Sequence, residues 1–388
     1  MLMFNNIAML KRLLLLFTIL FIASESVPAI TREYDGKNSF SIDSLMKNTE
    51  VDLRLNYGFF VHHHQEMKAY QADFPMFELS LQKQTYGNQS WQSYFNYPII
   101  GVTAFYSSLG NVDIIGNAYA IYPFINFPFN KSKINNLSFR FGVGLGYLTK
   151  KFDPIENYHN TSIGSNFNAA INLTFEYNHR FTKRYKMSVY AGLTHFSNGC
   201  STEPNNGLNL INAGISSSYL LGEPEKYIPR QAIDNKVYKK IEPEFYIGMS
   251  YGIKRIVYNQ KEDFSVFNLE LYVMDRISNL SKIGIGLDLV SDATDKITLR
   301  VFYGDDTEYT FAQLLKPGVS VAYELLLGKA SFLINFGYHP WGRDMRYGRW
   351  YQKLGMKVDF GKYLFGKIAL NTHFGAADFI GFGLGVKL

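Results

Sequence analysis

A histidine and a serine stand two residues apart in the stretch "AGLTHFSNGC", residues 191–200. His195 and Ser197 are residue types that hydrolases use as general base and nucleophile in acyl transfer. If residues 185–197 form a β-strand, its period of two places both side chains on one face, about 6.6 Å apart along the backbone. Side chains at that spacing can lean together into a hydrogen bond. The pair therefore suggests ester hydrolysis, provided that the strand exists.

Alternating apolar and small or polar residues predict that strand and many others. "FRFGVGLGY" (139–147) puts phenylalanine, valine, leucine and tyrosine on one face and arginine and glycine on the other. "KIGIGLDL" (282–289) and "FIGFGLGVKL" (379–388) repeat the alternation. Strands of roughly ten residues with aromatic ends are typical of a transmembrane β-barrel.

The N-terminus and the composition agree with an exported barrel. Lys11 and Arg12 precede an apolar run that is too short to span a membrane, and Ser24 and Ser26 follow it, as in a secretory signal peptide. The chain has 28 Tyr, 32 Phe and 32 Gly but only one Cys, so no internal disulfide can form. The net charge of +6 is spread along the chain, which excludes a nucleic-acid partner. We expect an all-β, antiparallel barrel protein of the bacterial outer membrane.

Strands are predicted in two series separated by a polar stretch near residue 230. This predicts a signal peptide (1–26), a polar lead-in (27–50), a barrel half that carries the His-Ser pair (51–222) and additional barrel strands (243–388). A single barrel of roughly 14–16 strands is the preferred arrangement, and even strand numbers are the rule for single-chain bacterial barrels. Two consecutive eight-stranded barrels are the alternative.

The same alternation places the candidate site on the outside of the barrel. His195 and Ser197 continue the apolar face of residues 185–193, which in a barrel faces lipid. Asn209 on the next strand has outward parity and returns towards His195 across the antiparallel pair. A nucleophile, a base and an amide thus converge at the membrane, as a hydrolase of membrane lipids requires.

The segment "THFSNGCSTEPNNGLN" resembles the signature of the outer-membrane lipid A 3-O-deacylase (PagL-like acyloxyacyl hydrolase) family, and the similarity covers about residues 50–222. The resemblance implies a serine esterase that acts on lipid A of lipopolysaccharide in the outer leaflet. His195 would be the base, Ser197 the nucleophile, and Asn205 an oxyanion donor with the backbone amides of Asn198 and Gly199. The family's orienting glutamate falls on Asn209 here, and Glu203 is the alternative acid in the loop.

Two other interpretations of the sequence stay open, phospholipase A and a barrel without enzymatic activity. "HFSNG" also resembles outer-membrane phospholipase A, which uses an asparagine at the position of Asn209 and needs calcium; the deacylase interpretation needs no cofactor. A porin or transporter without activity would show the same strands. "HHHQE" (62–66) offers metal-ligand types, but adjacent residues of an extended segment point to opposite sides, so we predict no metal site. The oligomeric state is not predicted.

Overall fold

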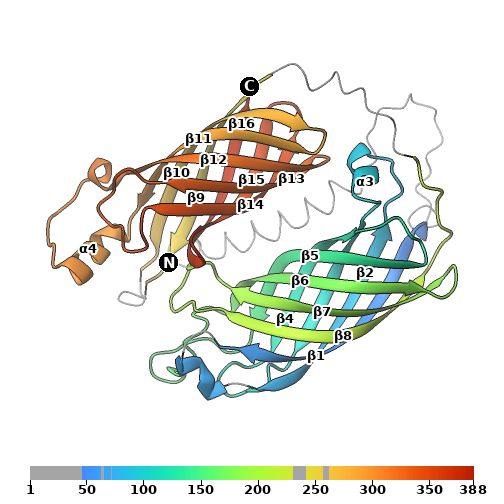
Figure 1. Ribbon diagram of the computed structural model, residues 1–388. Coiled ribbons are helices and arrows are strands. Elements are labelled where there is room, and N and C mark those ends of the chain that lie inside the picture. Colours follow the sequence, from blue (N-terminus) through green and yellow to red (C-terminus); the bar gives the residue numbers. More distant parts are fainter. Residues whose placement is uncertain (1–45, 63–64, 71, 230–241, 257–261) are drawn as a thin grey trace. The chain divides into compact units, whose positions relative to one another are not determined.

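The computed structural model describes residues 46–62, 65–70, 72–229, 242–256 and 262–388. They form two closed antiparallel β-barrels, built from β1–β8 and β9–β16 (Figure 1). The predicted signal peptide and residues 27–45 of the lead-in lie outside the described residues. The all-β barrel class is confirmed, in the form of the alternative: two consecutive eight-stranded barrels. A single large barrel is wrong because β8 pairs back onto β1, so the first barrel closes before β9 begins.

Each strand of the N-terminal barrel pairs with the next one along the chain. The pairing of β1 with β8 closes the barrel, and Leu53 lies opposite Ser217 in this closing ladder. Closure pairs the two edges of the sheet with each other. In a membrane, an open edge would leave backbone N–H and C=O groups without hydrogen-bond partners, which is energetically costly. The strands are β1 (Thr49–Val61), β2 (Asp73–Gln84), β3 (Ile99–Ser107), β4 (Ala118–Pro128), β5 (Asn135–Leu148), β6 (Phe167–Arg180), β7 (Tyr185–Ser197) and β8 (Leu208–Leu220).

The C-terminal barrel follows the same plan and closes through β16 and β9. Its strands are β9 (Glu244–Lys254), β10 (Phe264–Ser278), β11 (Ser281–Asp292), β12 (Lys316–Leu327), β13 (Ala330–Tyr338), β14 (Trp350–Phe360), β15 (Leu364–His373) and β16 (Ala376–Lys387).

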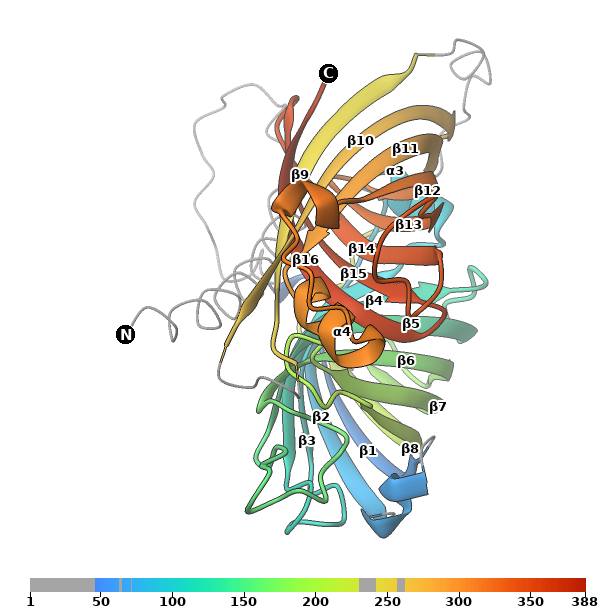
Figure 2. The ribbon, with the colours of Figure 1, turned by 90° about the vertical axis from the view of Figure 1, so that its left-hand side faces the viewer.

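Short helices occupy some connections: η1 (Gln65–Tyr70), α3 (Ser90–Tyr94), α4 (Asp295–Tyr303) and η4 (Phe311–Leu314). The helix α4 lies at one end of the C-terminal barrel, outside its wall of strands (Figures 1 and 2). Within the described part of the chain, no helix is long and apolar enough to cross a membrane.

Burial alternates along the strands with the apolar side outward, the reverse of a soluble barrel. In β1, Leu55 and Tyr57 are 46% and 63% exposed, whereas Arg54 and Asn56 are buried inside. Inside the barrel, the Arg54 guanidinium is 2.8 Å from a Glu176 carboxylate oxygen. Burying a charged side chain is costly unless an opposite charge pairs with it, so this ion pair allows both groups to lie inside the barrel. The apolar outer surface and polar interior are those of a barrel that stands in lipid.

Apolar side chains close the N-terminal barrel at the end where β7 stops and β8 starts. Phe196 and Leu208 are fully buried there and pack in one cluster with Phe105, Leu148 and Ile163. Phe196 lies between His195 and Ser197 in the chain, so the cluster holds the end of β7 from inside while its neighbours face outward. This packing fixes the direction of the candidate catalytic side chains.

Candidate active site at the end of β7

The end of β7 presents His195 and Ser197 on its outward face. Thr194 and Phe196 are fully buried, whereas His195 and Ser197 are partly exposed and Val189, on the same face, is 54% exposed. The predicted parity therefore matches the structure. Both side chains belong to the surface that the apolar residues of the strand share.

Asn209 lies directly opposite His195 in the β7–β8 ladder. Asn209 Oδ1 and His195 Nδ1 are 2.7 Å apart. An amide oxygen only accepts hydrogen bonds, so Nδ1 carries the hydrogen and the lone pair of a neutral imidazole is on Nε2. This contact selects the tautomer that a general base on the Nε2 side needs.

Asn205 lies beside the hydroxyl of Ser197. The backbone N–H of Asn198 donates to Asn205 Oδ1 at 2.9 Å, and this identifies the other amide atom as the nitrogen. Asn205 Nδ2 then donates to Ser197 Oγ at 2.9 Å. An N–H donor that reaches the nucleophile's oxygen also lies near the position that the oxyanion of a tetrahedral intermediate would take.

Gly207 supports the imidazole from the other side. Its φ is +78°, and a Cβ built on it would be 2.8 Å from His195 Cε1 and 3.4 Å from Nε2. A side chain at this position would be strained and would displace the ring. The glycine of the Pro-Asn-x-Gly turn therefore lets the backbone approach the imidazole closely.

The other sequence-predicted site residues lie in the connection between β7 and β8. The Asn198 N–H orients Asn205 in this structure, and the Asn198 side chain donates to Ser165 Oγ at 3.1 Å. Gly199 follows with φ +59°. Glu203 lies further along the connection and is partly exposed. Asn209 Oδ1 is a hydrogen-bond partner of the imidazole Nδ1.

Sequence reasoning missed Ser162 and Ser165, which lie between β5 and β6 and reach the connection. Ser162 accepts a hydrogen bond from the Gly207 N–H at 2.9 Å through its carbonyl oxygen. Serines in a loop carry no signal of such a contact, because the partners lie more than 30 residues apart.

A cavity of 440 Å³ opens at the opposite end of the N-terminal barrel, near the start of β7. Glu50 bridges Arg180 and Lys186 there, with oxygens 2.5 and 2.8 Å from the two cations. The described residues that line it carry hydroxyl groups but include no histidine. The cavity lining therefore offers no nucleophile–base pair of the Ser-His type.

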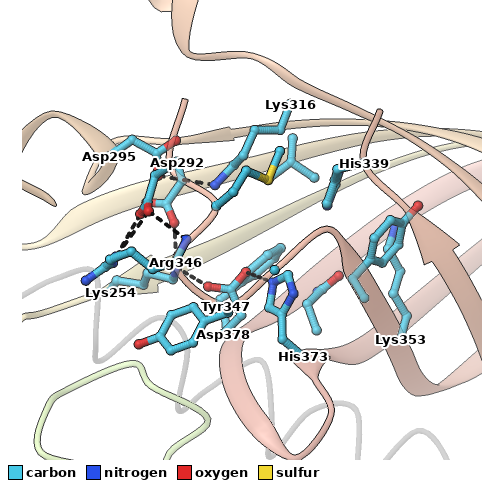
Figure 3. A pocket seen from close by; sticks show the side chains of 17 residues that line it. Lys254, Asp292, Asp295, Lys316, His339, Arg346, Tyr347, Lys353, His373 and Asp378 are labelled. Atoms are coloured by element: carbon cyan, nitrogen blue, oxygen red, sulfur yellow. Dashed lines mark hydrogen bonds and ion pairs between the residues drawn. The ribbon is translucent and has the colours of Figure 1, made fainter. Parts of the chain in front are cut away.

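The C-terminal barrel has its own polar pocket, of 40 Å³, at one end of its strands (Figure 3). Lys254 pairs with Asp292 and Asp378, and Lys316 with Asp295 at 3.2 Å. Among the described residues that line it there is no serine, threonine or cysteine. Burial raises the pKa of Asp295, in the first turn of α4, to about 7.

His373 at the end of β15 lines this pocket and belongs to a second Thr-His-Phe triplet. Its Nδ1 is 2.8 Å from the carbonyl oxygen of Trp350, and its Nε2 is 3.7 Å from an Asp378 oxygen. Gly375 stands where the first triplet is followed by a serine. The C-terminal barrel thus has a histidine on its seventh strand but a glycine at the position that corresponds to Ser197.

No group of three or more His, Cys, Asp or Glu side chains could hold a metal ion among the described residues. His63 and His64 of the "HHHQE" stretch lie outside them.

Two protein-family models match the chain. The model described as "Lipid A 3-O-deacylase (PagL)" matches residues 76–218, and the model described as "Acyloxyacyl hydrolase, C-terminal domain" matches residues 243–388. The first match runs from β2 into β8, and the second covers the C-terminal barrel. No curated protein matches the chain.

Solved structures similar to the chain are distant. The outer membrane enzyme PagL shares 15% identity over 42% of this chain and 97% of its own, with a TM-score of 0.31. A BenF-like porin from Pseudomonas fluorescens shares 9% identity over 88% of this chain and 97% of its own, with a TM-score of 0.22. The Pseudomonas putida toluene transporter TodX shares 9% identity over 94% of this chain and 91% of its own, with a TM-score of 0.17. The family assignment therefore rests on the two family models.

Both halves of the chain match models of one enzyme family, and both are closed barrels with apolar outer faces. The chain belongs to the lipid A 3-O-deacylase (PagL) family of carboxylic ester hydrolases, in a two-barrel form, and is a protein of the bacterial outer membrane.

Proposed function

We propose that this protein removes an ester-linked acyl chain from lipid A of lipopolysaccharide, with Ser197 as nucleophile and His195 as base on the lipid-facing surface of the N-terminal barrel. The observation that carries the proposal is the position of Ser197. Its hydroxyl is on the same strand face as His195, whose tautomer Asn209 selects, and it receives a hydrogen bond from Asn205.

The first half of the reaction acylates the enzyme. His195 Nε2 takes the proton of Ser197 as Oγ attacks the ester carbonyl. Asn205 Nδ2 donates to the oxyanion that develops, a contribution that is typically worth about 10²- to 10³-fold in rate. The intermediate collapses to acyl-Ser197 as its bond to the sugar oxygen breaks, and the imidazolium gives its proton to that oxygen, which leaves as a hydroxyl group.

The second half releases the acyl chain. His195 removes a proton from water, whose oxygen attacks the acyl-serine carbonyl, and Ser197 leaves with the proton from the imidazolium. The products are a fatty acid and a lipid A with one free hydroxyl. No step requires a cofactor.

Asn209 favours a second candidate, calcium-dependent phospholipase A. That family resembles this chain in the stretch "HFSNG" (195–199) and also has an asparagine at the position of Asn209. An amide holds the imidazole tautomer but stabilises the imidazolium less than a carboxylate does. The match of residues 76–218 to the deacylase model supports lipid A as the substrate.

The two candidates differ in substrate and in their need for calcium. We expect purified protein to release fatty acid from lipopolysaccharide in excess EDTA and to leave phospholipid vesicles intact. Lysophospholipid release that depends on calcium, with lipid A unchanged, would instead support the phospholipase. A Ser197→Ala variant in both assays is the control for a contaminating lipase.

A further inference from the structure

The connection between β5 and β6, residues 149–166, is folded into the same end of the N-terminal barrel as His195. Asn160, Ser162 and Ile163 are fully buried, and Ile163 belongs to the apolar cluster that closes the barrel. Asn160 Nδ2 donates to the carbonyl of Ile114 at 3.1 Å, and the Phe152 N–H donates to the carbonyl of Ile163 at 2.7 Å. The segment Asn160–Ser165 is therefore a firmly packed element.

Two hydrogen bonds join this element to the two ends of the β7–β8 connection. Near its start, Asn198 Nδ2 donates to Ser165 Oγ at 3.1 Å. At its end, the Gly207 N–H donates to the carbonyl of Ser162 at 2.9 Å. Ser165 is itself fixed, because its hydroxyl donates to the carbonyl of Phe167 at 2.9 Å.

One of these hydrogen bonds holds Asn198, which acts on the catalytic pair through Asn205, and the other holds Gly207, which contacts the pair directly. The Asn198 backbone N–H orients Asn205, whose Nδ2 reaches Ser197 Oγ. Gly207 lies against the imidazole of His195. A connection of about ten residues between two strand ends can adopt many conformations. Only some of them place Asn205 beside Ser197 and Gly207 against His195.

We propose that the segment Ser162–Ser165 is a positioning clamp for the active site and that Ser165 is a positioning residue. The clamp holds the β7–β8 connection in the conformation in which Asn205 faces the developing oxyanion. This inference rests on the proposed function, because it assigns the clamp to the reaction of Ser197. Ser165 acts through Asn198 and not on the reacting atoms.

The test replaces Ser165 by alanine and by threonine in the full-length protein and measures hydrolysis of a detergent-solubilised ester substrate. Ser165→Ala should lower kcat about 10- to 100-fold, which is the effect expected when catalytic groups are displaced by about 1 Å. The KM of this variant should stay within about twofold of the wild-type value. Ser165→Thr keeps the hydroxyl and should recover most of kcat. Labelling of Ser197 by an activated phosphonate should slow in parallel with kcat.

Ser188→Ala is the matched control. Ser188 lies near the other end of β7, is buried, and donates a side-chain hydrogen bond to Asn178. It should keep normal kcat, and heat-modifiable gel mobility should show that all variants fold. If Ser165→Ala does not fold, Ser165→Cys, which keeps the shape but weakens the hydrogen bond, should show the same fall in kcat.

Normal kcat in a folded Ser165→Ala protein, or an equal fall in Ser188→Ala, would overturn the clamp. A folded Ser197→Ala variant that still hydrolyses ester would overturn the proposed function instead, so the two failures are distinguishable.

Discussion

His195 and Asn209 face each other across the β7–β8 ladder, with 2.7 Å between Nδ1 and Oδ1. A neutral amide thus occupies the orienting position where a carboxylate would add charge stabilisation. The β7–β8 register makes this contact, since the two residues are direct partners.

Changing Asn209 tests whether tautomer selection contributes to catalysis. Asn209→Ala should lower kcat about 100-fold or more, because the imidazole loses its orienting acceptor. Asn209→Asp should raise kcat, because a carboxylate stabilises the imidazolium that forms in the transition state. Steady-state hydrolysis by folded variants gives the answer, and an Asn209→Ala enzyme with normal kcat would refute this role.

Substituting Gly207 tests the support of the imidazole. Gly207→Ala should abolish most activity, because the new Cβ would be 2.8 Å from His195 Cε1. Gly361→Ala is the matched control: its φ is +75°, close to the +78° of Gly207, and no atom of the described residues lies within 4 Å of the position that the new Cβ would take. Both variants carry the cost of a left-handed non-glycine residue, roughly 1–2 kcal/mol.

The Gly361→Ala protein should therefore be slightly destabilised but active. Equal activities in the two variants, measured on the same ester substrate, would show that Gly207 does not position His195.

Asp295 should make the C-terminal barrel less stable as pH rises. Its pKa is about 7 in the fold, against an ordinary value of 3.8, so the folded chain holds a proton that the unfolded chain has lost between these pH values. Its contribution to stability therefore falls as pH rises from about 4 to 7 and stays low above 7. Asparagine stays neutral at every pH. The free energy of unfolding of Asp295→Asn minus that of the wild type should therefore be larger at pH 8 than at pH 5.

Tryptophan fluorescence can follow this barrel by itself. The chain has three tryptophans, of which Trp341 and Trp350 lie in the C-terminal half, so a Trp91→Phe background reports on it alone. Thermal unfolding midpoints of Asp295→Asn and of the exposed control Asp306→Asn should diverge with pH. A difference between Asp295→Asn and wild type that is the same at pH 5 and pH 8 would contradict the raised pKa.

The orientation in the membrane decides whether the site can reach lipopolysaccharide. Ile155, which is 84% exposed, lies in the β5–β6 connection at the active-site end, and Lys183 lies in the turn before β7. In a Cys200→Ser background, Ile155→Cys should react with a membrane-impermeant maleimide on intact cells. Lys183→Cys should react only after the outer membrane is permeabilised, and the reverse pattern would place His195 at the inner leaflet.

Local alternation was sufficient to predict the strands and the shared face of His195 and Ser197. The alternating stretch 139–147 predicts a strand, and it lies within β5 (Asn135–Leu148). Barrel closure was not predictable in this way. Leu53 and Ser217, which pair in the closing ladder, lie far apart in the sequence, and the residues around each of them do not indicate which strand it will pair with. Ser165 was missed for the same reason: its contact with Asn198 depends on how two loops pack.

The most direct test of the account is the lipid A of cells that express the protein. Mass spectrometry of lipid A and phospholipids should be compared between cells with wild-type protein and cells with Ser197→Ala, at equal levels of folded barrel. We expect wild-type cells to contain lipid A that lacks one acyl chain, and Ser197→Ala cells to contain only the fully acylated form. Deacylated lipid A in the Ser197→Ala cells, or lipid A unchanged by the wild-type protein, would contradict the account.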